Sequence, residues 1–121
     1  MDSKKNILLV DDDSIYLFIA QKIINKILPD AIINTCKNGQ EAISLMDSLN
    51  PDIMFLDINM PVLNGWDLLD KLINQKINFP IFIVSSSIDE KDKAKAKSYV
   101  DLVKGYISKP LNADKLKSLI D

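Results

Sequence analysis

Carboxylates follow two apolar segments of this chain, and a lysine follows a third. Asp11 and Asp12 come directly after the first segment, and Asp57 comes directly after the second. Lys109 lies near the far end, just before a proline. Carboxylates gathered at the tips of buried strands repel one another, by roughly 4 kcal/mol for each pair at ~4 Å and an effective dielectric near 20. Such a cluster is matched by a hard divalent cation with oxygen ligands and by an aspartate that acts as a nucleophile.

The elements that position these residues are short apolar runs, which alternate with helical periodicity along the whole chain. The expected strands cover residues 7–10, 31–35, 53–56, 81–85 and 106–108. Strand–helix alternation with short loops favours parallel pairing and right-handed crossovers. The sequence therefore predicts an α/β fold with a doubly wound, five-stranded parallel sheet and five helices.

The segments between the strands carry helix signals. Ser14 is expected to cap the first helix, and the later helices are expected to begin near Gly39, Gly65, residue 89 and residue 112. The first helix is expected to present one apolar stripe, made of Ile15, Phe18, Ile19, Ile23 and Ile27. The fourth helix is expected to span about residues 89–103, with a thin apolar face at Ala94, Tyr99, Val100 and Val103.

Ligands of doubly wound sheets bind beyond the carboxyl ends of the strands. Polar residues follow four of the expected strands at this edge: Asp11, Asp12, Asp13, Asp57, Ser85 and Lys109. This convergence predicts one functional site that combines carboxylates, a hydroxyl and an ammonium group.

Composition excludes several other classes of chemistry. The chain has 121 residues, no histidine, no arginine and a net charge of −2, so histidine-based catalysis and arginine readout of nucleic acid are both excluded. Cys36 is the single cysteine and is expected to be buried. No long apolar run marks a membrane span, and the polar start is unlike a signal peptide. One cytoplasmic domain over residues 1–121 is expected, with no nucleic acid or membrane as a direct partner.

Asp57 could have a purely structural role, since an aspartate after a strand is commonly a turn or cap residue. The loop that follows favours chemistry instead, because Pro61 and Gly65 stiffen and turn it and so present the Asn59 carbonyl beside the carboxylate. Asp13 is expected to serve only at the helix entry, where negative charge favours the helix dipole.

Lys109 and Ser85 suit the oxygens of a phosphoryl group. The ammonium is a compact point charge, the proline after Lys109 holds its backbone extended, and the serine hydroxyl is a further donor at the end of its strand. Ser86 and Ser87, in contrast, read most simply as loop.

These motifs, together and in this order, resemble the receiver domain of two-component response regulators, of the stand-alone chemotaxis type. The residues that carry the resemblance are Val10-Asp11-Asp12, Leu56-Asp57-Ile58-Asn59-Met60-Pro61 with Gly65, Val84-Ser85, and Gly105-Tyr106-Ile107-Ser108-Lys109-Pro110. The resemblance implies a flavodoxin-like sheet with strand order 2-1-3-4-5. It also implies a phosphorelay protein that is no turnover enzyme and has no output domain attached.

The resemblance also implies roles for single residues. Asp57 would accept a phosphoryl group from a sensor histidine kinase or phosphotransfer protein. Asp12 would bind Mg²⁺ directly, Asp11 chiefly through water, and the Asn59 carbonyl would be a further ligand beside Asp57. Ser85 and Lys109 would bind the phosphoryl group.

Three more expectations follow from the same resemblance. Tyr106 would turn inward from solvent when Ser85 moves. Asn59 and Ser87 would tune the lifetime of the acyl phosphate. The switched face would bind an unknown protein target or a second copy of the chain, as a phosphorylation-dependent homodimer.

Two alternatives stay open. A haloacid-dehalogenase-like phosphatase also uses an aspartate nucleophile and Mg²⁺, and Asp11-Asp12-Asp13 could be read as its Asp-x-Asp motif. A degenerate receiver could act only as a binding module. Turnover of a generic phosphomonoester separates the phosphatase from the receiver.

Overall fold

The computed structural model describes residues 5–87 and 89–120 and contains one five-stranded parallel sheet in the order β2-β1-β3-β4-β5. The strands are β1 (Asn6–Val10), β2 (Ile32–Cys36), β3 (Ile53–Leu56), β4 (Ile81–Ser85) and β5 (Val103–Ser108). The predicted fold class and strand order are confirmed.

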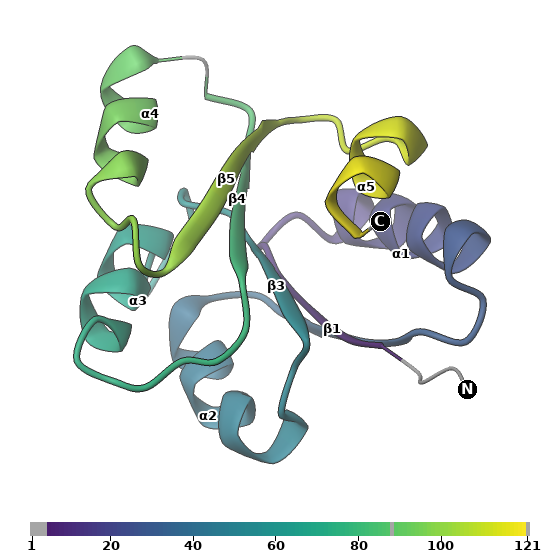
Figure 1. The fold of residues 1–121 in the computed structure, drawn as a ribbon, viewed down its shortest axis with the longest axis horizontal. Helices are drawn as coiled ribbons and strands as arrows, with labels where there is room; N and C mark the ends of the chain where they lie inside the picture. The colour runs from purple at the N-terminus through teal and green to yellow at the C-terminus, as the bar shows by residue number, and fades with distance from the viewer. Residues whose placement is uncertain (1–4, 88, 121) are drawn as a thin grey trace.

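Helices cover both faces of the sheet. They are α1 (Ser14–Ile27), α2 (Gly39–Leu49), α3 (Gly65–Leu72), α4 (Glu90–Lys97) and α5 (Ala113–Ile120). Figure 1 shows α1 and α5 on one side of the sheet and α2, α3 and α4 on the other. This arrangement explains why the central strands are apolar along their whole length, because side chains on both faces of each strand are buried.

Two apolar cores result, one on each face. Alternate residues of a strand point to opposite faces, so Leu8 and Leu56 pack under α2 and α3, whereas Leu9 and Phe55 pack under α1 and α5. Cys36 is fully buried, as expected.

The sheet register aligns the carboxyl ends of the strands. Val10 pairs with Leu56, and Ser85 pairs with Ser108. The residues that follow β1, β3 and β5 therefore emerge along one edge, beside Ser85 at the end of β4. This alignment assembles the site.

The first helix differs from the prediction in its cap and in its buried face. Asp13, not Ser14, is the cap, since its side chain accepts hydrogen bonds from the backbone N–H groups of Ile15 and Tyr16. The buried residues are Leu17, Ala20 and Ile24. The expected stripe is largely turned to solvent, with exposed fractions of 74% for Ile15, 61% for Phe18 and 49% for Ile19.

The fourth helix is shorter than predicted. It ends at Lys97, and the backbone N–H groups of Leu102 and Val103 both donate to the carbonyl of Tyr99, at 2.9 and 2.8 Å. Val103 then begins β5 and pairs with Ile81, and Val100 is exposed. Of the apolar residues that suggested a longer helix, only Ala94 lies in α4, whereas Tyr99 and Val100 belong to the turn after it and Val103 to the start of a strand.

An aromatic anchor joins the end of α4 to α3. The rings of Tyr99 and Trp66 stack with centroids 6.0 Å apart, and Tyr99 Oη donates a hydrogen bond to Asp70. Lys95 Nζ lies 4.8 Å from the centre of the Trp66 ring on the same cluster. The carboxyl-terminal end of α4 is thus fixed by several contacts.

We expect Tyr99→Phe to lower the free energy of unfolding by about 1 kcal/mol, because it removes the hydrogen bond to Asp70 and keeps the stacked ring. Urea unfolding followed by fluorescence of Trp66, the single tryptophan, measures this change. Asp70→Ala and the double variant complete the cycle. If the two single effects simply add, the hydrogen bond is not the cause.

Candidate functional site

Three carboxylates meet at the carboxyl edge of the sheet, as predicted. Asp11, Asp12 and Asp57 each offer an oxygen within 4.8 Å of the other two. Asp11 and Asp57 are 2% and 6% exposed, whereas Asp12 faces solvent. The Asp11 carboxylate also accepts a hydrogen bond from the backbone N–H of Asp13, at 2.8 Å. Asp13 therefore shapes the site through its backbone, while its side chain caps α1.

Lys109 brings a positive charge into this cluster. Its Nζ lies 2.8 Å from Asp11 Oδ2 and 3.9 Å from Asp57 Oδ2. The backbone N–H of Lys109 donates to the carbonyl of Ser85 at 2.9 Å, which ties the loop after β5 to the end of β4. Lys115, from α5, donates to the carbonyls on both sides of Lys109, at Ser108 and Pro110. The loop after β5 is therefore held by the end of β4 and by α5.

Burial and neighbouring charges perturb the pKa of Asp57. Burial is the main cause that raises the pKa of its carboxyl group, from 3.8 to about 6, and the negative charge of Asp11 adds to it. Lys109 and the backbone N–H of Asn59, 3.3 Å from Asp57 Oδ1, act in the opposite direction. One ammonium group does not offset three carboxylates, so an added cation would favour the charged, nucleophilic form of Asp57.

Glycine at position 65 allows α3 to begin close to the backbone of Asp57. A Cβ at Gly65 would lie 2.7 Å from the carbonyl oxygen of Asp57 and 2.7 Å from the Cα of Ile58. The start of α3 can therefore approach the end of β3 only without a side chain at this residue.

Ser85 is fully buried at the end of β4, and its Oγ accepts a hydrogen bond from the backbone N–H of Ser87 at 3.0 Å. The side chain of Ser87 turns toward α4, where its Oγ donates to Asp92 Oδ2 at 2.6 Å. Sequence reasoning missed Asp92, since a residue in a lysine-rich helix gives no local signal for this contact.

Tyr106 differs from the expected starting conformation. Its ring is half-buried against the core under α4, and its hydroxyl donates to the carbonyl of Ser87 at 3.1 Å. The predicted solvent-facing ring is therefore wrong for this structure, because the loop between β4 and α4 offers the hydroxyl an acceptor.

Tyr16 was also missed by sequence reasoning. Lys109 Nζ lies 4.3 Å from the centre of its ring. Burial, followed by the charges of Asp11 and Asp57, raises the pKa of its hydroxyl well above the usual value, so the phenol stays neutral. Its position in the first turn of α1, soon after the carboxylates, is a signal that could have pointed to it.

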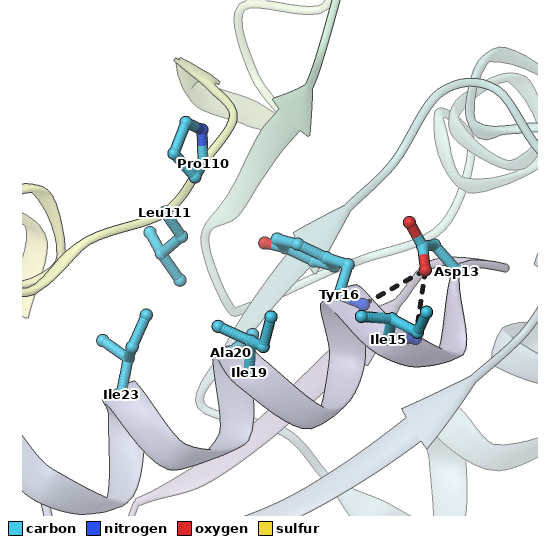
Figure 2. A pocket seen from close by; sticks show the side chains of 8 residues that line it. All are labelled: Asp13, Ile15, Tyr16, Ile19, Ala20, Ile23, Pro110 and Leu111. Atoms are coloured by element: carbon cyan, nitrogen blue, oxygen red, sulfur yellow. Dashed lines mark hydrogen bonds between the residues drawn. The ribbon is translucent and has the colours of Figure 1, made fainter.

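A groove of about 220 Å³ lies beside this loop, between α1 and the segment that carries Pro110 and Leu111 (Figure 2). Ile15, Ile19 and Ile23 line its α1 side. The groove is apolar and opens next to the carboxylate edge.

A model of the family "Response regulator receiver domain" matches residues 7–121. The chain belongs to this family. The receiver domain is 35% identical over 115 residues to the nitrate/nitrite response regulator protein NarL of Escherichia coli K12, and this match covers 93% of the chain and 52% of NarL. It is 38% identical over 86 residues to a protein-glutamate methylesterase/protein-glutamine glutaminase of Bacillus subtilis, with 68% of the chain and 23% of that relative covered.

A solved structure agrees with this assignment. The receiver domain superposes on a two component response regulator from Cytophaga hutchinsonii with a TM-score of 0.86 and 36% identity, over 97% of this chain and 95% of that one. It is therefore a response regulator receiver domain of two-component signalling, with the fold that its sequence resemblance implied. The receiver domain spans about half the length of the curated relative NarL.

Across residues 5–87 and 89–120, the receiver domain has no helix long and apolar enough to cross a membrane.

The raised pKa of Asp57 has a consequence for stability. Because the folded chain holds the Asp57 proton more tightly than the unfolded chain, stability falls as the pH rises from 3.8 to about 6. Asp57→Asn, which stays neutral, should be more stable than the parent above this window by about 1–3 kcal/mol. Below this pH window, the two proteins should be about equally stable.

Urea unfolding of both proteins without added divalent cation, at a pH below 3.8 and at one well above 6, measures this difference. A gap that is the same at both pH values would contradict the raised pKa.

Proposed function

We propose that this receiver domain accepts a phosphoryl group on Asp57 from the phosphohistidine of a sensor kinase or phosphotransfer protein, in a Mg²⁺-dependent reaction. The observation that supports this most directly is the buried Asp57 carboxylate, which lies beside Asp11 and Lys109 at the carboxyl edge of the sheet. The chain that carries it belongs to the receiver family.

The transfer is a displacement at phosphorus. An Asp57 oxygen attacks the phosphorus atom, a P–O bond forms, and the P–N bond to the imidazole breaks with its electron pair left on nitrogen. Hydrolysis later breaks the acyl phosphate by attack of water and releases inorganic phosphate. The domain catalyses its own phosphorylation and dephosphorylation and is otherwise no turnover enzyme.

Mg²⁺ fits the donor set of this edge. Asp12 and Asp57 would hold the ion directly, Asp11 chiefly through water, and the Asn59 carbonyl would complete the protein ligands. Oxygen ligands and an uncompensated negative charge favour a hard divalent cation. When bound, the ion supplies positive charge that neutralises the incoming phosphoryl oxygens.

Lys109 and Ser85 would bind the phosphoryl oxygens as donors. The ammonium already lies between Asp11 and Asp57, so it needs only a small movement to reach an oxygen on Asp57. Ser85 would give its hydroxyl proton to another oxygen, and charge-assisted hydrogen bonds of this kind are strong. Asn59 and Ser87 would tune how readily water attacks.

The phosphodonor protein would dock over the exposed side of α1. Its histidine must reach Asp57 at this edge of the sheet, and Ile15 and Ile19, which are 74% and 49% exposed, present apolar surface at the groove beside it. Apolar surface of this kind is typical of protein interaction sites.

Readout would occur on the face formed by α4, β5 and α5. Ser85, Ser87 and Tyr106 are joined by hydrogen bonds through the loop after β4, so a Ser85 movement toward the phosphoryl group would alter this network. We take residues 1–121 as one receiver domain whose altered face binds a target protein or another copy of itself.

Acetyl phosphate with Mg²⁺ should add one phosphoryl group to the parent protein and none to Asp57→Asn, because the amide cannot attack phosphorus. Intact-mass spectrometry measures this, and peptide mapping locates the group. Stoichiometric labelling of Asp57→Asn at another residue would refute the assignment. Rapid turnover of a generic phosphomonoester would favour a phosphatase instead.

Asp12→Ala should weaken Mg²⁺ binding by roughly tenfold or more, because even groups that only support a ligand commonly cost this much. Isothermal titration with Mg²⁺ measures the affinity. Asp13→Ala is the matched control: it loses the α1 cap, worth about 1 kcal/mol of stability, and should leave Mg²⁺ affinity nearly unchanged. Equal losses in the two variants would remove Asp12 from the ligand set.

A further inference from the structure

Lys109 reaches the carboxylates along the face of an aromatic ring. Its Nζ lies 4.3 Å from the centre of the Tyr16 ring, 2.8 Å from Asp11 Oδ2 and 3.9 Å from Asp57 Oδ2. The lysine side chain is only 18% exposed. The ammonium is therefore in contact with carboxylates and with the negative face of a π system at the same time.

Tyr16 is itself held in place. Its ring packs against the core under α1 and α5, and Figure 2 shows it extending from the first turn of α1 toward the segment of Pro110 and Leu111. Its amide donates to the Asp13 cap. The ring is thus held at the start of α1, directly after Asp11 and Asp12.

The hydroxyl group does not explain why a tyrosine stands here. Among the described residues, the Tyr16 hydroxyl is buried and makes no hydrogen bond, which costs free energy relative to a phenylalanine. The one polar interaction of Tyr16 that its chemistry accounts for is the contact of its ring with Lys109.

We propose that the ring of Tyr16 is a positioning group that holds the Lys109 ammonium between Asp11 and Asp57, where it can bind a phosphoryl oxygen. A lysine stem is flexible, and the ammonium lies closer to Asp11, at 2.8 Å, than to Asp57, at 3.9 Å. A ring face attracts a cation without fixing its direction, so the ammonium can move from Asp11 toward a phosphoryl oxygen and keep this contact. The proposal deepens the proposed function and rests on Lys109 binding the phosphoryl group.

The contact is tested first in the parent protein without any phosphodonor. A methylene group held over an aromatic ring is shielded by the ring current, so the ε-methylene protons of Lys109 should resonate upfield of those of a lysine that lies over no ring. In Tyr16→Phe the upfield shift should remain, and in Tyr16→Leu it should disappear. Unshifted Lys109 protons in the parent would overturn the proposal without any variant.

The function is tested by the rate of phosphorylation with acetyl phosphate and Mg²⁺. Tyr16→Leu should slow it by roughly threefold to thirtyfold, the range expected from loss of a cation–π contact, and Tyr16→Phe should restore the parent rate. In a Lys109→Ala background, Tyr16→Leu should cause no further loss, because Tyr16 acts through Lys109. Equal losses in Tyr16→Phe and Tyr16→Leu, or additive losses in the double variant, would overturn the proposal.

The same helix offers a matched control. Lys22 Nζ lies 4.8 Å from the centre of the Phe18 ring, which is 61% exposed. Phe18→Leu removes a second cation–π contact of α1 and should leave the rate unchanged, and an equal slowing there would overturn the proposal. If Asp57 of the parent takes no phosphoryl group, the proposed function fails, while the Lys109 shift still reports on the ring contact.

Discussion

The constraint on which this structure depends is the accumulation of negative charge at one edge of a buried parallel sheet. Parallel strands in register bring their following residues together whatever those residues are, and here three are carboxylates facing one lysine. The surrounding contacts reduce the resulting repulsion or limit its consequences. The backbone N–H of Asp13 donates a hydrogen bond to the Asp11 carboxylate, and the backbone N–H of Asn59 donates one to the Asp57 carboxylate. Lys109 lies between the two acids. The remaining excess charge is what makes the edge receptive to a cation.

Sequence reasoning succeeded wherever the pattern was decided within one element. The central strands are apolar on both faces, and polar residues at their ends must meet at one edge, so the sheet and the carboxylate cluster were both predictable. The same local reasoning found Gly65, whose close approach to the Asp57 backbone leaves no space for a side chain.

It failed where two elements had to be placed against each other. The first helix is apolar around much of its circumference, so its composition does not decide that Leu17 and Ala20, rather than Ile15 and Phe18, face the sheet. Tyr16 and Lys109 are distant in sequence and meet only because α1 packs beside the loop that enters α5. The boundary at Val103 was missed because β-sheet pairing with Ile81 outweighs helical spacing.

The two ends of α4 are held unequally. Its far end is fixed by the stacked rings and the hydrogen bond to Asp70. Its near end meets the site loop at a single side chain, that of Ser87, whose Oγ donates to Asp92 and accepts from the backbone N–H of Asp89. A displacement that begins at Ser85 would therefore be largest near Asp92 and smallest near Tyr99. Trp66 lies beside Tyr99, so its fluorescence would barely register the motion, and a dye near Glu90 would be the better reporter.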